Sequence, residues 1–261
     1  MNSIATVERG AGPPLVLIPG IQGRWEYTRP TVEALAAHFR VATFSLGGRS
    51  NGRGIFGSEV DRLAAVLDTH RLERAILCGI SYGGLVAMRF AAIHPERTAA
   101  LVLASTPGPD WHLRPRHLFY ARWPWLFGPL FLLETPFRLR AELVTALPNQ
   151  DERRTFVRWQ IRTLLSAPVS LVQMAARARE LPVPGIPSDC ARVSSPTLIV
   201  TGEPSLDRVV PVDGTASYVR LIRGAKHVVL ERTGHQGTIT RPAAFADIVH
   251  SFARHAAEAV A

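Results

Sequence analysis

Residues 79–83, Gly-Ile-Ser-Tyr-Gly, place a serine between two glycines at the junction of a strand and a helix. The apolar run 75–78 before them predicts a buried strand, and residues 85–92 after them predict a helix packed on that strand. Since neither glycine has a Cβ atom, the strand and the helix can approach closely at this turn. In this strand–turn–helix context, a G-x-S-x-G sequence raises its serine above the sheet. The sequence therefore predicts that the turn presents the Ser81 hydroxyl as a nucleophile.

The same pattern occurs a second time in residues 48–52, Gly-Arg-Ser-Asn-Gly. A strand-like run, 41–44, precedes it, but no apolar helix begins after it, and further glycines would interrupt one. A phosphate-binding loop is disfavoured as well, because no lysine follows and no helix opens on the segment. We interpret this segment as a glycine-rich loop and favour Ser81 over Ser50 as the nucleophile.

Short apolar runs alternate with amphipathic helical stretches in two blocks of the chain, which predicts an α/β fold with a mostly parallel, doubly wound sheet. The predicted strands are residues 15–18, 41–46, 75–79, 99–104, 196–200 and 227–230, and the predicted helices are 30–39, 59–70, 83–93, 213–223 and 242–258. Between the blocks, residues 107–195 lack a strand pattern but contain several helical patches. A stretch of this length favours an inserted helical cap over a loop. The expected organisation is a core of residues 1–106 and 196–261 with a cap of residues 107–195.

The net charge of +9 raises the question of nucleic-acid binding. The basic residues are spread along the chain, only Lys226 is a lysine, and no basic run with interleaved aromatic residues occurs. We therefore expect no nucleic-acid partner. The two cysteines argue against a disulfide framework. The absence of a signal pattern and of an apolar run of membrane-spanning length predicts a cytoplasmic protein without stable membrane insertion.

A serine hydroxyl needs a base, usually histidine, and that base needs a carboxylate to orient it. Suitable residues follow two of the predicted strands. Residues 201–211 contain Glu203 and Asp207, and residues 231–235 end in Gly234-His235. Both loops lie beyond the carboxyl ends of strands, the edge at which open α/β sheets place their sites. The sequence thus supplies a serine, an aspartate and a histidine, in that chain order, at one edge of the predicted sheet.

These motifs together closely resemble the α/β-hydrolase superfamily. The resemblance covers residues 14–106 and 196–257 as its core, with residues 107–195 similar to its variable cap. It is carried by five sequences: Pro19-Gly20-Ile21-Gln22-Gly23, the turn at 79–83, His94-Pro95-Glu96-Arg97, Asp207-Arg208-Val209-Val210-Pro211, and Gly234-His235. The resemblance implies Ser81 as nucleophile, His235 as general base and then acid, and Asp207 as its orienting carboxylate. It also implies an oxyanion hole from the backbone N–H groups of Ile21 and Tyr82.

The chain departs from the family pattern at two points. Pro19 stands where the family usually has a histidine, so a polar support for the oxyanion loop is missing. Asp207 also follows its strand at a greater distance than usual, which leaves Glu203 and Asp213 as alternative acids. We favour Asp207 because the Val-Val-Pro sequence after it matches the family pattern.

Candidate substrate-binding residues lie next to the oxyanion loop and in the aromatic part of the cap: Gln22, Trp111, Tyr120 and Trp123. The cap aromatics could form an apolar acyl pocket, a homodimer surface or the cap's own core. Nearby arginines would also suit an anionic membrane, but the segment is too irregular in period for us to favour that interpretation.

We predict a serine hydrolase that cleaves small-molecule carboxylic esters with an apolar acyl part. No cofactor is expected, and no metal-ligand spacing is visible. The same triad could instead hydrolyse a C–C bond, open a lactone or make peracids, because a fold does not choose among chemistries. A ligand receptor or signalling protein with slow or no turnover is the alternative outside enzymes.

Overall fold

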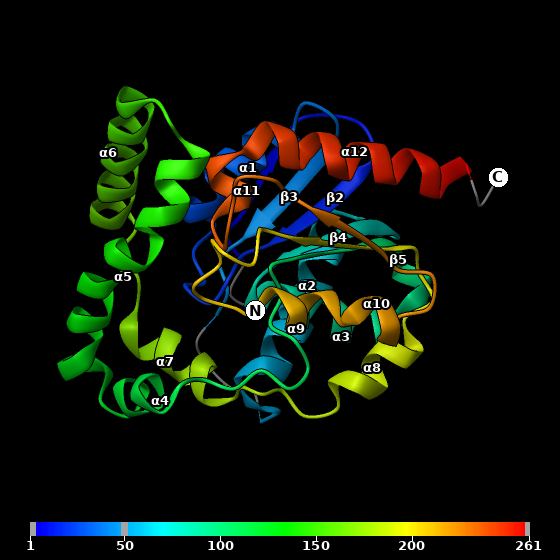
Figure 1. The fold of residues 1–261 in the computed structure, drawn as a ribbon. Coiled ribbons are helices and arrows are strands. Elements are labelled where there is room, and N and C mark those ends of the chain that lie inside the picture. Colours follow the sequence, from blue (N-terminus) through cyan, green and yellow to red (C-terminus); the bar gives the residue numbers. More distant parts are fainter. Residues whose placement is uncertain (1–3, 48–51, 259–261) are drawn as a thin grey trace.

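A seven-stranded sheet forms the centre of the computed structural model, which describes residues 4–47 and 52–258 (Figure 1). The strands are β1 (Thr6–Arg9), β2 (Pro14–Ile18), β3 (Arg40–Phe44), β4 (Ala75–Ile80), β5 (Thr98–Ala104), β6 (Thr197–Thr201) and β7 (Lys226–Val229). Their order in space is β1-β3-β2-β4-β5-β6-β7, and every neighbouring pair is parallel except β1 with β3. The predicted α/β class with a mostly parallel sheet is confirmed.

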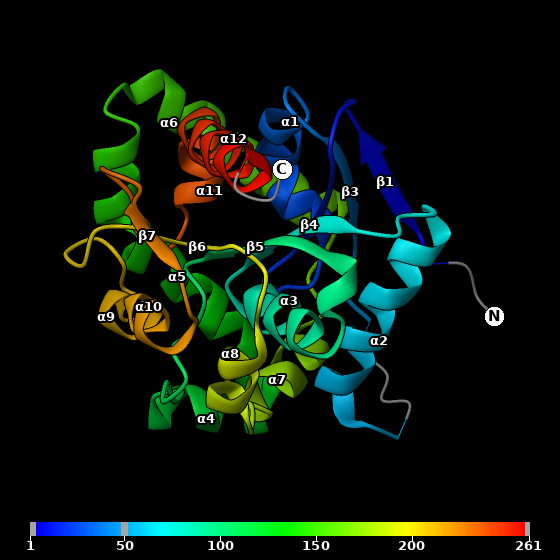
Figure 2. The same ribbon diagram turned by 90° about the vertical axis from the view of Figure 1, so that its right-hand side faces the viewer.

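Helices cover both faces of this sheet, as Figure 2 shows. The core helices are α1 (Arg29–Leu35), α2 (Gly54–Thr69), α3 (Tyr82–Ile93), α9 (Val212–Ala216), α10 (Tyr218–Leu221), α11 (Gly237–Thr240) and α12 (Pro242–Glu258), with 3₁₀ turns η1 (Trp25–Thr28) and η2 (Pro95–Arg97). One buried apolar cluster joins one face of the sheet to α2 and α3, and a second joins the other face to α1 and α12. Apolar residues on both faces of β2 and β4 explain why these strands are continuous apolar runs.

Strand β1 was not predicted, because its sequence, Thr-Val-Glu-Arg, is short and mostly polar. It lies at the edge of the sheet, where one side of the strand faces solvent. Polar contacts secure it there: both Nε and Nη2 of Arg40 donate to the Glu8 carboxylate, at 2.9 and 3.0 Å, and His70 Nδ1 lies 2.7 Å from Glu8 Oε2. Edge strands commonly carry charged residues of this kind.

Five helices lie between β5 and β6, and four of them, α4 to α7, form a layer at one side of the sheet (Figure 1). Their bounds are α4 (Pro115–Arg122), α5 (Pro124–Ala146), α6 (Gln150–Ser166), α7 (Leu171–Arg179) and α8 (Ile186–Arg192). We refer to α4–α7 as the inserted helices. Helix α8 instead packs on α3, where Ile186 and Cys190 join the buried cluster of that face.

The C-terminal part differs from its prediction in one respect. The predicted helix 213–223 is divided into α9 and α10, which meet at Ser217. Across the described ranges 4–47 and 52–258, no helix combines the length and the apolar character needed to cross a membrane.

Candidate active site

Ser81 occupies a strained turn between β4 and α3. Its backbone has φ 53° and ψ −122°, which is a costly conformation for a residue with a side chain. Close packing on both sides requires the two glycines of the turn. A Cβ atom on Gly83 would lie 2.4 Å from the carbonyl oxygen of Ile18, and one on Gly79 would lie 2.4 Å from that of Gly83. The turn therefore holds Ser81 at the carboxyl edge of the sheet, directly after β4.

The structure brings Ser81 together with His235 and Asp207. His235 Nε2 lies 3.2 Å from Ser81 Oγ, and His235 Nδ1 lies 3.3 Å from Asp207 Oδ2. The other oxygen of Asp207, Oδ1, accepts hydrogen bonds from the N–H groups of Val209 and Val210, both at 2.9 Å. These bonds fix the carboxylate, so that it can hold the imidazole with Nε2 directed at the serine.

Burial and charge act in opposite directions on these two groups. Burial alone would lower the pKa of His235, but the charge and hydrogen bond of Asp207, together with the charge of Glu142, raise it above its ordinary value. Burial likewise opposes ionisation of Asp207, but His235 and the two backbone N–H donors outweigh it and lower the pKa of Asp207. Asp207 therefore remains ionised beside an imidazole that accepts a proton readily.

The two alternative acids lie elsewhere. Glu203 Oε1 accepts a hydrogen bond from the backbone N–H of Arg232 at 2.6 Å, so its carboxylate ties the two loops together. Asp213 is exposed in the first turn of α9. Of the three candidates, only Asp207 is hydrogen-bonded to His235 among the described residues.

The loop after β2 runs beside the serine turn. A Cβ atom built on Gly20 would lie 3.6 Å from the Cβ atom of Ser81, so this loop comes within van der Waals range of the serine one residue before Ile21. Tyr82 is the first residue of α3. Within the described part of the chain, neither the Ile21 nor the Tyr82 N–H donates a hydrogen bond to another residue. Two free N–H groups next to a nucleophile could stabilise an oxyanion.

A buried arginine of α7 supports this loop. Arg177 Nη1 donates to the carbonyl oxygen of Ile21 at 3.1 Å, and Nη2 donates to that of Gly47. Its Nε lies 3.4 Å from Glu59 Oε1, and both side chains are buried. Glu59 Oε2 in turn accepts from the Gly47 N–H at 2.9 Å. Arg177 thus provides polar support for the loop that has Pro19 in place of a histidine.

A second buried carboxylate lies behind His235. Glu142 comes from α5, and its Oε1 accepts a hydrogen bond from the backbone N–H of Gln236 at 2.7 Å. Burial raises the pKa of Glu142 to about 7. Neither Glu142 nor Arg177 is among the site residues that the sequence predicts. In the sequence, each is a charged residue within a helical segment, a pattern that is far more common on solvated helix surfaces.

The four predicted substrate-binding residues divide into two groups. Gln22 lies on the loop after β2, with Oε1 3.1 Å from a Cβ built on Gly20, and Trp111 packs against the buried cluster that includes α3. The hydroxyl of Tyr120 lies 3.3 Å from Glu134 Oε1. Trp123 is exposed, and its ring lies edge to face with that of Trp125. The contacts found for Tyr120 and Trp123 thus lie within the inserted helices.

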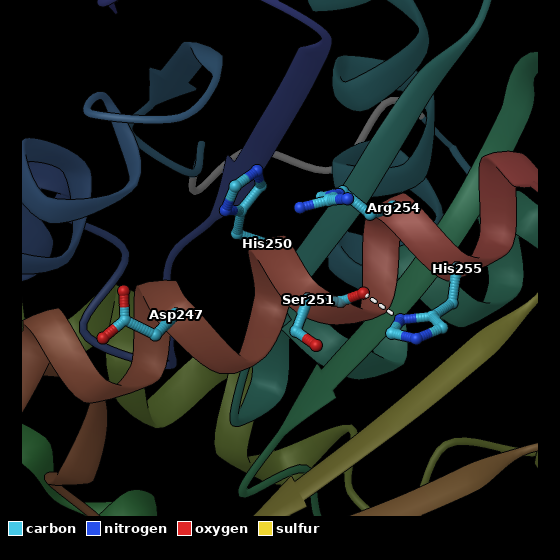
Figure 3. A pocket seen from close by; sticks show the side chains of 5 residues that line it. All are labelled: Asp247, His250, Ser251, Arg254 and His255. Atoms are coloured by element: carbon cyan, nitrogen blue, oxygen red, sulfur yellow. Dashed lines mark hydrogen bonds between the residues drawn. The ribbon is translucent and has the colours of Figure 1, made fainter.

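A separate hollow of about 410 Å³ lies on α12, lined by Asp247, His250, Ser251, Arg254 and His255 (Figure 3). His250 stacks on His38, with ring centroids 4.1 Å apart. None of these residues belongs to the serine site. In the part of the chain that the structure describes, no group of three or more His, Cys, Asp or Glu residues could hold a metal ion. Ser50, of the second G-x-S-x-G sequence, lies outside the described residues.

Known proteins resemble this chain along most of its length. The model of the alpha/beta hydrolase family matches residues 15–248. A pimeloyl-[acyl-carrier protein] methyl ester esterase of Nitrosomonas europaea is 25% identical over 258 residues, which cover 94% of this chain and 97% of that protein. The Aeromonas salmonicida protein of the same name is 29% identical, covering 95% and 98%. The structure of a thermophilic esterase from Thermogutta terrifontis aligns with a TM-score of 0.75 at 23% identity, covering 97% of this chain and 93% of that one.

Proposed function

Because the chain belongs to the alpha/beta hydrolase family, we propose that it is a serine hydrolase that cleaves carboxylic esters with an apolar acyl part. One observation carries this proposal. The imidazole of His235 lies within 3.2 Å of the Ser81 hydroxyl and within 3.3 Å of the buried Asp207 carboxylate. This arrangement is what a serine needs to attack a carbonyl carbon.

In the proposed reaction, Ser81 Oγ attacks the ester carbonyl while His235 Nε2 takes its proton. Asp207 holds the imidazole in orientation and stabilises its protonated form. The N–H groups of Ile21 and Tyr82 bind the oxyanion, with each donor contributing roughly 3–4 kcal/mol to transition-state stabilisation. The leaving alcohol takes the proton from His235, and water then hydrolyses the acyl-enzyme by the same sequence of transfers.

Two features support the choice of an apolar ester. The relatives from Nitrosomonas and Aeromonas are named as methyl ester esterases. The inserted helices, which we propose act as a cap over residues of the core, are rich in aromatic side chains, and Trp111, shortly before α4, packs against the buried cluster that includes α3. Apolar walls with a few polar groups are typical of small-molecule sites.

The test is a panel of p-nitrophenyl esters from acetate to laurate, measured with the native protein, Ser81→Ala and Ser105→Ala. Ser105 is a matched control, because it is also a buried serine with positive φ at the end of a neighbouring strand. We expect Ser81→Ala to lose at least roughly 10⁴-fold in kcat and Ser105→Ala to keep most activity.

Labelling adds an independent readout. A fluorophosphonate should modify the native protein on the peptide that contains Ser81, and His235→Ala should abolish the modification. Absence of both turnover and labelling, together with thermal stabilisation by a bound ester, would instead indicate a ligand receptor. Turnover of lactones or diketones in preference to every ester would change the substrate class and retain the triad.

A further inference from the structure

Helix α5 leaves one of its sides uncovered. Leu126, Leu130, Leu133, Phe137 and Val144 recur at spacings of three, four or seven residues, which places them on one side of a helix. All five are exposed, and Phe137 is exposed to 81%. The other side of α5 contacts α4, α7 and α11 and contains the buried Gly128 and Glu142. The uncovered side is therefore apolar, although no element of residues 4–47 and 52–258 covers it.

Further exposed aromatic residues lie at the end of α4 and the start of α5. Phe119 is half exposed, and Trp123 and Trp125 lie edge to face with their ring centroids 6.5 Å apart. We call these residues together the α4–α5 face: Phe119, Trp123, Trp125, Leu126, Leu130, Leu133, Phe137 and Val144. Figure 1 shows both helices at the margin of the molecule, α4 at the lower left and α5 at the left, with the sheet to their right. Exposed apolar patches of this extent mark interaction sites.

The charges on these two helices have one sign wherever they are exposed. Arg116, Arg122 and Arg140 are exposed. Neither of the two acids on these helices is an exposed, unpaired charge. Glu134 forms an ion pair with Arg116 at 2.6 Å, and Glu142 is buried. Arg122 and Arg140 take part in no ion pair with any of the described residues. Helical spacing places Arg140 within the apolar side itself, between Leu133 and Val144.

We propose that the α4–α5 face docks on an anionic lipid bilayer. Tryptophan, phenylalanine and leucine enter the boundary between headgroups and acyl chains, while arginine binds lipid phosphate, and each basic residue near such a surface contributes roughly 1 kcal/mol. A second copy of the chain fits less well. A two-fold contact would bring Arg122 and Arg140 of both copies onto one interface, with no exposed acid of α4 or α5 to meet them.

This inference goes beyond the proposed hydrolysis and does not depend on it. The face is nevertheless connected to the serine site through α5. Glu142, on the other side of this helix, accepts a hydrogen bond from the backbone N–H of Gln236, the residue after His235. A bilayer bound at the face would therefore lie next to the inserted helices that border the site.

Sedimentation with vesicles tests the proposal. The full chain is mixed with phosphatidylcholine vesicles with and without phosphatidylglycerol, at low and high salt. We expect the native protein to bind the anionic vesicles, and high salt to weaken this binding. The double variant Leu133→Asp/Phe137→Asp should bind them at least tenfold more weakly. Arg122→Gln/Arg140→Gln should weaken binding by roughly fivefold for each arginine removed. Ile93→Asp is the matched control, because Ile93 is an exposed apolar residue outside the face.

Two results would overturn the proposal. One is failure of the native protein to bind anionic vesicles. The other is equal binding by the native protein and Leu133→Asp/Phe137→Asp. Sedimentation velocity tests the competing occupant, a second copy of the chain. If the native protein is a dimer that does not bind vesicles, and the double variant is a monomer, the face is assigned to a second copy. Turnover of a soluble p-nitrophenyl ester, with circular dichroism, shows that each variant is folded and reports on the hydrolase proposal separately.

Discussion

Glu142 accepts a hydrogen bond from the backbone N–H of Gln236, the residue that follows His235. The two residues are far apart in the chain, since one comes from α5 and the other from the loop after β7. The contact fixes the histidine loop to the inserted helices and places a second carboxylate near the imidazole. The other oxygen of Glu142, Oε2, is buried without a partner among the described residues. The site therefore contains an ionisable group that the triad does not account for.

The pH dependence of catalysis should reveal this second carboxylate. His235 must be neutral to accept the serine proton, and Asp207 and Glu142 raise its pKa. We expect kcat/KM to fall with decreasing pH below a midpoint higher than that of an ordinary histidine, and Glu142→Gln to move this midpoint to lower pH. Asp213→Asn is the control, because Asp213 is an exposed acid and its replacement should leave the midpoint of the pH profile unchanged. An unchanged midpoint in Glu142→Gln would refute electrostatic coupling between the two groups.

Stability should depend on pH through the same carboxyl group. Its pKa is raised from an ordinary 4.5 to about 7, so the folded state binds the proton more tightly than the unfolded state. The resulting stabilisation is complete below about pH 4.5 and is lost as pH rises through 7. It amounts to about 3 kcal/mol, at about 1.4 kcal/mol for each pKa unit. Urea unfolding from pH 4.5 to 8 should show this decline in the native protein and a smaller one in Glu142→Gln. Parallel curves would contradict the assignment.

The identity of the orienting acid can be tested with isosteric changes. Asp207→Asn keeps an oxygen for the Val209 and Val210 N–H groups but turns an amide toward His235, which favours the wrong tautomer. We expect kcat to fall by about 10⁴-fold. Glu203→Gln should retain most activity, because Glu203 bonds the backbone of Arg232 rather than the imidazole. A larger loss in Glu203→Gln than in Asp207→Asn would reverse the assignment.

Arg177 should act as a positioning residue for the oxyanion loop. Arg177→Met leaves the buried Glu59 with only its ion pair to Arg62, at 3.6 Å, which should cost about 3 kcal/mol of stability. It also removes the donor to the Ile21 carbonyl, so kcat should fall with little change in KM. The double variant Arg177→Met/Glu59→Gln separates the two effects. We expect it to regain stability and not kcat; recovery of both would make Arg177 a structural residue only.

The serine turn should not tolerate a methyl group at Gly83. The added Cβ would lie 2.4 and 2.5 Å from the carbonyl oxygens of Ile18 and Pro19, which are backbone atoms that cannot rotate away. We expect Gly83→Ala to lose roughly 1–3 kcal/mol or more of stability and most of its activity. Gly214→Ala is the control, because the nearest atom to its Cβ would be 3.6 Å away. Equal stability of the two variants, measured by thermal unfolding, would argue against the close approach.

The sequence determined the parts of this protein that depend on neighbours in the chain. A glycine on each side of Ser81, between an apolar run and a helix, predicts the strained turn because steric exclusion acts over a few residues. Alternating apolar runs predict the parallel sheet, whose carboxyl edge then collects the loops of Asp207 and His235.

Only the tertiary structure decided which charged residues are buried and what they contact. Glu142, Arg177 and Glu59 lie in helical segments that look solvated in the sequence, and their burial depends on segments about 90 to 130 residues away. Conversely, the apolar residues of α5 look like core positions, but no element of the described chain packs on them. Burial is a property of the assembled fold, so local pattern cannot specify it. The long-range contacts that place a carboxylate behind His235 exist only once the inserted helices meet the sheet.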